Sequence, residues 1–138
     1  MATGALQVPP NCDLTLGVLC LDKSVPGRSV WQMDADERFE NPAGLIQGGF
    51  LGALADSAMG AAAVTFAEGR RVSVANAEMK ASFLAPVRRG ATLRCEAIVV
   101  AGGSRTAFVE ATITDETGRL IVRASSTYLY RDRTPSAP

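Results

Sequence analysis

The spacing of apolar and polar residues predicts a β-hairpin near the start of the chain. Residues 14–21 are mainly apolar, residues 29–39 alternate imperfectly between apolar and polar side chains, and Pro26-Gly27 lies between the two runs. Two such runs on either side of a Pro-Gly pair are typical of strands joined by a turn. Residues 41–44 (NPAG) have turn chemistry and are expected to end this hairpin.

A helical rhythm begins at Gly48 and continues to about Ala67. Gly and Ala fill the gaps between larger apolar residues at positions 50, 51, 54, 59, 64 and 66, which is roughly the spacing of an α-helix. Such a helix would be about 30 Å long. Asp56 lies near its centre, and a carboxylate there costs about 2.5–3.5 kcal/mol on membrane insertion. We therefore expect a buried helix of a soluble protein and no membrane partner.

Strand-like segments make up most of the remaining chain. They cover residues 72–84, 92–101, 105–114 and 119–130. Turns at Gly102-Gly103 and Thr117-Gly118 imply consecutive antiparallel hairpins. A hairpin, a long helix and four strands predict an α+β fold, in which a curved antiparallel sheet of five to six strands wraps one long central helix. The side of the helix that the sheet leaves open needs a partner, so we expect a homo-oligomer.

The length of 138 residues suits a single domain. We expect this domain over residues 13–131, because the segments on either side are rich in Pro, Gly and polar residues. Such compositions are typical of loose chain ends. Residues 1–12 are therefore predicted to form a flexible N-terminal arm, and residues 132–138 a flexible C-terminal tail.

Charge and residue usage exclude several kinds of function. Lys plus Arg and Asp plus Glu number 14 each, so the net charge is zero, which argues against a nucleic-acid binder. The chain has no His, which removes His-dependent nucleophiles, general bases and metal ligands. Cys12, Cys20 and Cys95 show no metal-binding spacing and predict reduced thiols, with Cys20 and Cys95 in the core. Reduced cysteines, together with the expected lack of a signal peptide at the N-terminus, favour a cytoplasmic protein. The lack of His and of metal-binding Cys spacing predicts that it holds no metal.

Three segments together resemble the hotdog-fold acyl-CoA thioesterases, in particular their phenylacetate-degradation-type (PaaI-like) branch. The resemblance covers roughly residues 41–130 and depends on the order and spacing of all three segments. They are residues 41–49 (NPAGLIQGG) with Asp56 in the helix that follows, residues 82–87 (SFLAPV) with Arg89-Gly90, and residues 102–105 (GGSR) with 115–120 (DETGRL). The resemblance implies a hotdog fold and a thioesterase site.

The family pattern places Asn41, the Gly48-Gly49 pair and the helical acid Asp56 in that site, with two departures. Gln47 stands where the family carries His, and it keeps a hydrogen-bonding side chain that cannot titrate. Asn76 stands where the family carries Ser or Thr, which leaves a polar group for orienting water but affects substrate choice.

The implied reaction is hydrolysis of an acyl-CoA thioester, with no cofactor. Asp56 would act as general base or nucleophile, and the unpaired N–H of Gly48 at the helix start would stabilise the oxyanion. Gly49 is a further candidate for substrate binding, although the Gly48-Gly49 pair also permits a tight turn into the helix. The amides of Asn41 and Gln47 would bind water or the thioester. The family pairs two subunits, so Gly48 of one chain would face Asp56 of its neighbour in a homodimer that assembles into a homotetramer.

Further residues are candidates for substrate binding. Arg88, Arg89 and Arg105 lie near flexible backbone, where they could bind the phosphates of coenzyme A. Phe50 would line the acyl pocket. Each candidate has a plainer interpretation: a solvent-facing or capping Asp56, a turn at Asn41, core packing for Phe50 and surface charge for the arginines.

Two other functions remain open. They are a non-catalytic acyl-CoA binding protein and a hotdog dehydratase, which the lack of His disfavours.

Overall fold

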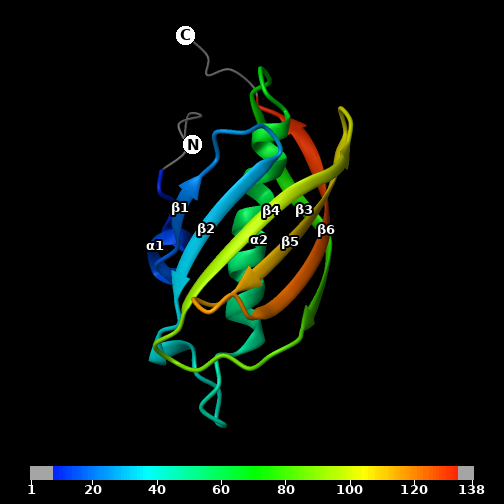
Figure 1. Cartoon of the computed structure of the whole chain (residues 1–138). Helices are drawn as coiled ribbons and strands as arrows, with labels where there is room; N and C mark the ends of the chain where they lie inside the picture. Colours follow the sequence, from blue (N-terminus) through cyan, green and yellow to red (C-terminus); the bar gives the residue numbers. More distant parts are fainter. Residues whose placement is uncertain (1–7, 134–138) are drawn as a thin grey trace.

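A six-stranded antiparallel sheet curves around a single long helix in the computed structural model, which describes residues 8–133 (Figure 1). This arrangement confirms the predicted α+β fold, with six strands around one central helix. The strand order is β1-β2-β4-β5-β6-β3. In chain order the elements are α1 (Asn11–Leu16), β1 (Leu19–Asp22), β2 (Arg28–Asp34), the short 3-10 helix η1 (Glu37–Phe39), α2 (Gly48–Phe66), β3 (Val72–Phe83), β4 (Thr92–Gly102), β5 (Thr106–Thr114) and β6 (Leu120–Asp132).

Helix α2 packs against the concave face of the sheet, as Figure 1 shows. Its length and mean hydropathy of 1.3 would suffice for a membrane span, but its apolar residues contribute instead to the hydrophobic core formed with the strands. Most of them are small, so the strands approach the helix axis closely. The buried residues are Leu51, Gly52, Leu54, Ala55, Ala58, Met59, Ala62 and Ala63.

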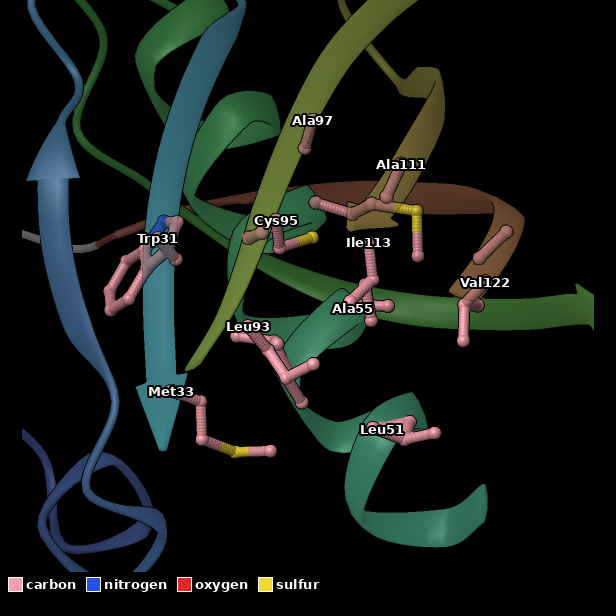
Figure 2. Packing of buried hydrophobic residues seen from close by; sticks show 14 of the residues in the cluster. Trp31, Met33, Leu51, Ala55, Leu93, Cys95, Ala97, Ala111, Ile113 and Val122 are labelled. Carbon is pink, nitrogen blue, oxygen red and sulfur yellow. The ribbon is translucent and has the colours of Figure 1, made fainter. Parts of the chain in front are cut away.

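The core lies between α2 and the inward side chains of the strands, several of which Figure 2 shows. In β5 buried and more exposed residues alternate, which is the period expected of a strand with one covered face. Cys95 is buried, as predicted, and burial raises the pKa of its thiol to about 12. Cys20 is exposed, so the prediction that it lies in the core is wrong. It belongs to the short edge strand β1, which only β2 flanks.

The N-terminal part of the first predicted strand is helical. Helix α1 takes up residues that were predicted to extend the hairpin, and Gly17 ends it with a left-handed backbone (φ 72°). The second strand is also shorter than predicted: it ends at Asp34, and the η1 turn follows, where the Asp36 side chain accepts a hydrogen bond from Arg38 N at 2.8 Å. Residues 1–7 of the predicted arm and 134–138 of the predicted tail lie outside the described residues.

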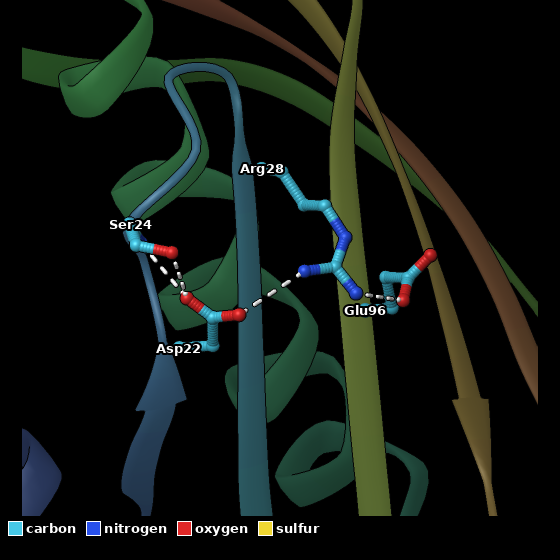
Figure 3. Close-up of polar contacts among 4 residues, drawn as sticks. All are labelled: Asp22, Ser24, Arg28 and Glu96. Atoms are coloured by element: carbon cyan, nitrogen blue, oxygen red, sulfur yellow. Dashed lines mark hydrogen bonds and ion pairs between the residues drawn. The ribbon is translucent and has the colours of Figure 1, made fainter.

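The β1–β2 hairpin is confirmed, and a polar cluster on its surface joins it to β4 (Figure 3). Arg28 pairs with Asp22 at 3.4 Å and with Glu96 at 2.8 Å. Hydrogen bonds from Ser24, its backbone N–H first, hold the pKa of the Asp22 carboxyl below its usual value. The cluster links three strands, but because its groups remain partly exposed it adds little stability.

Two features of the topology position the residues discussed below. Strand β3 lies at an edge of the sheet, and among residues 8–133 it pairs only with β6, which leaves its other side without a strand partner there. The segment between β3 and β4 runs past the start of α2, where Ile46 N donates to Val87 O at 2.8 Å. Both the Gly-rich start of α2 and the loop after β3 therefore lie at the same end of the molecule.

Replacing Leu54 tests whether the helix–sheet contact is the main source of stability. Leu54 is fully buried, so Leu54→Ala should lower the free energy of unfolding by about 2–5 kcal/mol through the cavity it leaves. Val64→Ala on the same helix is the matched control, because Val64 is 41% exposed, and its effect should stay below about 1 kcal/mol. Urea unfolding followed by circular dichroism measures both, and equal losses would contradict the assignment of the core.

Candidate active site

Asn41 organises the loop that leads into α2. Its side-chain Oδ1 accepts hydrogen bonds from Ala43 N at 2.9 Å and Leu45 N at 3.1 Å, and its own N–H donates to Leu45 O at 2.7 Å. Gly44 completes the turn with a left-handed backbone (φ 77°). The turn interpretation of Asn41 is therefore confirmed. The same residue also lines a cavity beside the helix start, so a turn role and a binding role are compatible.

The first N–H groups of α2 are not capped by a side chain. Gln47 is the N-cap residue with extended backbone (φ −62°, ψ 136°), and its side chain forms no capping hydrogen bond. Its backbone N–H donates to Phe39 O at 2.8 Å, which anchors the loop. The N–H groups of Gly48 and Gly49 have no acceptor within the helix, because first-turn donors never do. A helix start of this kind favours a developing negative charge.

Gly48 lies tightly against the Phe83 ring, whereas Gly49 has open space around it. A Cβ at Gly48 would lie 3.0 Å from Cζ of Phe83, and a Cβ at Gly49 would meet no atom within 4 Å. Beside them is a largely apolar cavity of about 370 Å³. Its lining comprises Asn41, Leu45, Ile46, Gly48, Leu51, Phe83, Leu84, Ala85, Pro86 and Val87. The predicted pocket residue Phe50 instead stacks on Phe39, with ring centroids 4.4 Å apart.

Asp56 is exposed midway along α2, and one of its oxygens is held by two neutral donors. Oδ1 accepts a hydrogen bond from the Tyr128 hydroxyl at 2.5 Å and another from Asn76 Nδ2 at 3.0 Å. Burial first, and then the nearby Asp56 carboxylate, raise the pKa of Tyr128 well above its usual value. The phenol is therefore a permanent donor at neutral pH. Within residues 8–133 no cation pairs with Asp56.

A β-bulge in β3 turns Asn76 toward the helix. The register with β6 shifts between Asn76 and Glu78, and bulges of this kind re-aim side chains. Glu78 N donates to Asn76 Oδ1 at 3.2 Å, which leaves Nδ2 facing Asp56 and also Ser126 Oγ at 3.2 Å. The predicted substrate-binding residue Asn76 is thus a direct partner of the predicted acid.

Tyr128 and Ser126 belong to this group although the sequence pattern does not mark them as site residues. Tyr128 is 2% exposed and Ser126 is fully buried, so their strand alternation marks both as core residues. The available signal was chemical, because a buried Tyr hydroxyl or Ser hydroxyl needs a hydrogen-bond partner. No feature of the sequence shows that this partner is the carboxylate on α2.

The predicted arginines are divided between the two ends of the molecule. Arg88 and Arg89, with Arg119, line a second cavity of about 500 Å³ that shares Pro86 with the first. Arg89 also pairs with Glu37 at 3.1 Å. Arg105 belongs to the β4–β5 turn, where Arg70 Nη1 donates to Ser104 O at 3.0 Å.

That turn contacts the opposite end of α2, so Arg105 and Gly48 are far apart in one chain. A Cβ on Gly102, the last residue of β4 before the turn, would collide with the ring of Phe66, the last residue of the helix. Nineteen helical residues extend about 28 Å. By the same geometry Asp56 lies about 12 Å along the axis from Gly48. The structure therefore brings together Asp56 with Asn76, and Gly48 with Asn41, as two separate groups.

Comparisons with known proteins identify the family to which this chain belongs. The model of the thioesterase superfamily matches residues 43–122. Human acyl-coenzyme A thioesterase 13 is 27% identical over 125 residues, which cover 89% of this chain and 87% of that protein.

Two solved structures share the fold over most of their length. The Escherichia coli PaaI protein from the phenylacetic acid degradation operon superposes with a TM-score of 0.83 at 20% identity, covering 94% of this chain and 88% of that one. A variant of the phenylacetic acid degradation protein PaaI from Thermus thermophilus has a TM-score of 0.77 at 26% identity, covering 85% and 96%. Because the family match spans more than half of the sequence, the chain belongs to the thioesterase superfamily.

Proposed function

We propose that this chain hydrolyses acyl-CoA thioesters to the free acid and coenzyme A. Membership of the thioesterase superfamily and the similarity to acyl-coenzyme A thioesterase 13 support the reaction class. The observation that carries the proposal is the carboxylate of Asp56, which neutral donors hold in place on an otherwise small-residue helix. An exposed carboxylate fixed in this way is available to act on a substrate.

The reaction needs an attacking group and a donor for the oxyanion. Asp56 either takes a proton from the attacking water or itself attacks the thioester carbonyl carbon to form an anhydride, which water then cleaves. In both routes the carbon–sulfur bond breaks and the coenzyme A thiolate leaves and takes up a proton. The N–H of Gly48 stabilises the oxyanion that develops on the carbonyl oxygen. Asn41 shapes the loop beside it, and the Gln47 amide contributes hydrogen bonding without titrating.

A complete site in this proposal uses two chains. Gly48 and Asp56 are about 12 Å apart along one helix, which is too far for both to contact one thioester carbonyl. Pairing of β3 with its counterpart in a second copy would extend the sheet across a homodimer. In the part of the chain that the structure describes, one side of β3 has no strand partner and much of the strand is exposed. Gly48 of one protomer would then face Asp56 of its partner. We further propose that two such dimers assemble into a tetramer.

The cavities suggest how coenzyme A would lie. Gly48 and Phe83 line the apolar cavity, which suits the thioester and the chain attached to it. Arg88 and Arg89 line the adjoining cavity and would bind the phosphates. Arg105 lies at the other end of the helix, so it would reach the same ligand only from a second chain.

A non-catalytic acyl-CoA binding protein is the second candidate. Gln47 replaces the family's His, and its side chain neither titrates nor caps the helix. Tight binding of acyl-CoA with no turnover above background would favour this alternative. Thiol release from a panel of aromatic, branched and medium-chain acyl-CoAs distinguishes the two functions.

Replacing the acid is the direct test of catalysis. Asp56→Asn keeps the size of the side chain but removes the negative charge, so kcat should fall by roughly several hundredfold while acyl-CoA binding persists. Thiol release with a chromogenic disulfide reagent gives the rate, and calorimetry gives the affinity. An unchanged kcat would contradict the role of Asp56.

The oxyanion donor is tested by removing only its N–H. Gly48 is the first residue of α2, a position that tolerates Pro, and the backbone of Gln47 already has the extended conformation that precedes Pro. Gly48→Pro should therefore fold and lose roughly 10²–10³-fold in kcat. Gly48→Ala is the matched control, since it adds a Cβ near Phe83 but keeps the donor. Equal rates in the two variants would show that Phe83 crowding, and not the N–H, matters.

Mixing two inactive variants tests the two-chain site. In a heterodimer of Asp56→Asn and Gly48→Pro chains, one site contains both intact residues and the other contains neither. After joint unfolding and refolding, about a quarter of wild-type activity should return, because about half of the dimers are mixed and each has one working site. Recovery of no activity, with mixed dimers verified by mass spectrometry, would place Gly48 and Asp56 in the same chain's site.

A further inference from the structure

We infer that Tyr128 is a positioning residue for the reaction, and that it leaves Asp56 Oδ2 as the oxygen that reacts. The inference depends on the proposed thioesterase function and extends it to a residue outside the predicted site. It starts from the two hydrogen bonds that converge on one carboxylate oxygen, Oδ1.

The Tyr128 hydroxyl is well suited to hold a carboxylate in one orientation. Its 2.5 Å bond to Oδ1 has the length of a charge-assisted O–H···O⁻ contact. The backbone oxygen of Asp56 is a more distant acceptor at 3.1 Å, so the single hydroxyl proton goes to the side chain. Tyr128 is 2% exposed and cannot swing away without unpacking the core. The donor is therefore fixed before any substrate binds.

Asn76 reinforces the same orientation from the neighbouring strand. Its Nδ2 donates to Oδ1 at 3.0 Å and to Ser126 Oγ at 3.2 Å, while Glu78 N fixes the amide oxygen. An oxygen that accepts two hydrogen bonds has its in-plane lone pairs occupied. Oδ2 consequently keeps its lone pairs for a water proton or for the carbonyl carbon of the thioester.

Small residues flank Asp56 on the side of the helix that faces the sheet. Gly52 and Gly60 lie one turn before and one turn after Asp56, on the stripe that faces β3 and β6. A Cβ at Gly52 would lie 3.4 Å from Met79 Cε, and one at Gly60 would lie 3.7 Å from Tyr128 Cε1. Both separations are ordinary van der Waals contacts, so β3 and β6 pack directly against the helix on either side of the acid.

Tyr130 provides a matched control on the same strand. Its hydroxyl also donates to α2, but to the backbone oxygen of Ala63, away from the acid. Tyr128→Phe and Tyr130→Phe each remove one hydroxyl that bonds the helix. Only the first removal affects Asp56, so a general loss of packing would lower the activity of both variants.

The test compares kcat and KM for thiol release in these variants. Tyr128→Phe should lower kcat roughly ten- to a hundredfold with KM within about twofold, and Tyr130→Phe should leave both within about twofold. Adding Tyr128→Phe to Asp56→Ala should cause no further loss, because the phenol acts through the acid. An unchanged kcat in Tyr128→Phe, equal losses in both Phe variants, or losses that multiply in the double variant would overturn the inference.

A second measurement does not depend on turnover or on the folding of Tyr128→Phe. The hydroxyl proton of Tyr128 should give a downfield proton resonance in the wild type that moves upfield in Asp56→Asn; no such change would overturn the inference. A structure with a non-hydrolysable acyl-CoA analogue should place Oδ2 nearer than Oδ1 to the carbonyl carbon position, and the reverse would overturn it. Wild-type protein without turnover would instead overturn the proposed function.

Discussion

The packing of α2 against the concave face of the sheet is the contact on which the rest of the structure depends. Five of the eight buried residues of the helix are Gly or Ala, so the strands lie close to its backbone. A close approach brings side chains of β3 and β6 within hydrogen-bonding distance of a residue on the helix surface. With larger residues on this stripe, Asp56 would stand apart from its two donors.

The same packing places a charged group at a boundary between core and solvent. Asp56 is exposed, whereas its donor Tyr128 is buried and Asn76 is held by a bulge. A carboxylate in this position keeps access to substrate while neutral donors restrict its orientation. An ion pair with Arg or Lys would also restrict the carboxylate, but the cation would stabilise its negative charge and make it a weaker base and nucleophile.

The start of α2 supplies the complementary feature. Asn41 and Gln47 form the loop through backbone bonds and side-chain bonds to the backbone, and the first helical N–H groups remain open. The departures from the family pattern fit these roles in different ways. Gln47 leaves the helix start uncapped, while Asn76 supplies a donor where a Ser or Thr hydroxyl would have a shorter reach.

The sequence alone determined the long helix and the two hairpins around Gly102-Gly103 and Thr117-Gly118, because periodicity and turn residues are local properties. The choice of Asp56 and Gly48 came from the family resemblance and stays a prediction. The sequence predicted one strand over residues 14–21, where the structure has the end of a six-residue helix and then a short strand. Both elements are rich in apolar residues, so composition does not separate them. Only the tertiary structure decided that Tyr128 and Asn76 hold one oxygen of Asp56, that Phe50 packs on Phe39, and that Arg105 lies far from Gly48. These relations join residues 11 to 72 positions apart, and the order of the strands together with the bulge in β3 determines which side chains reach Asp56.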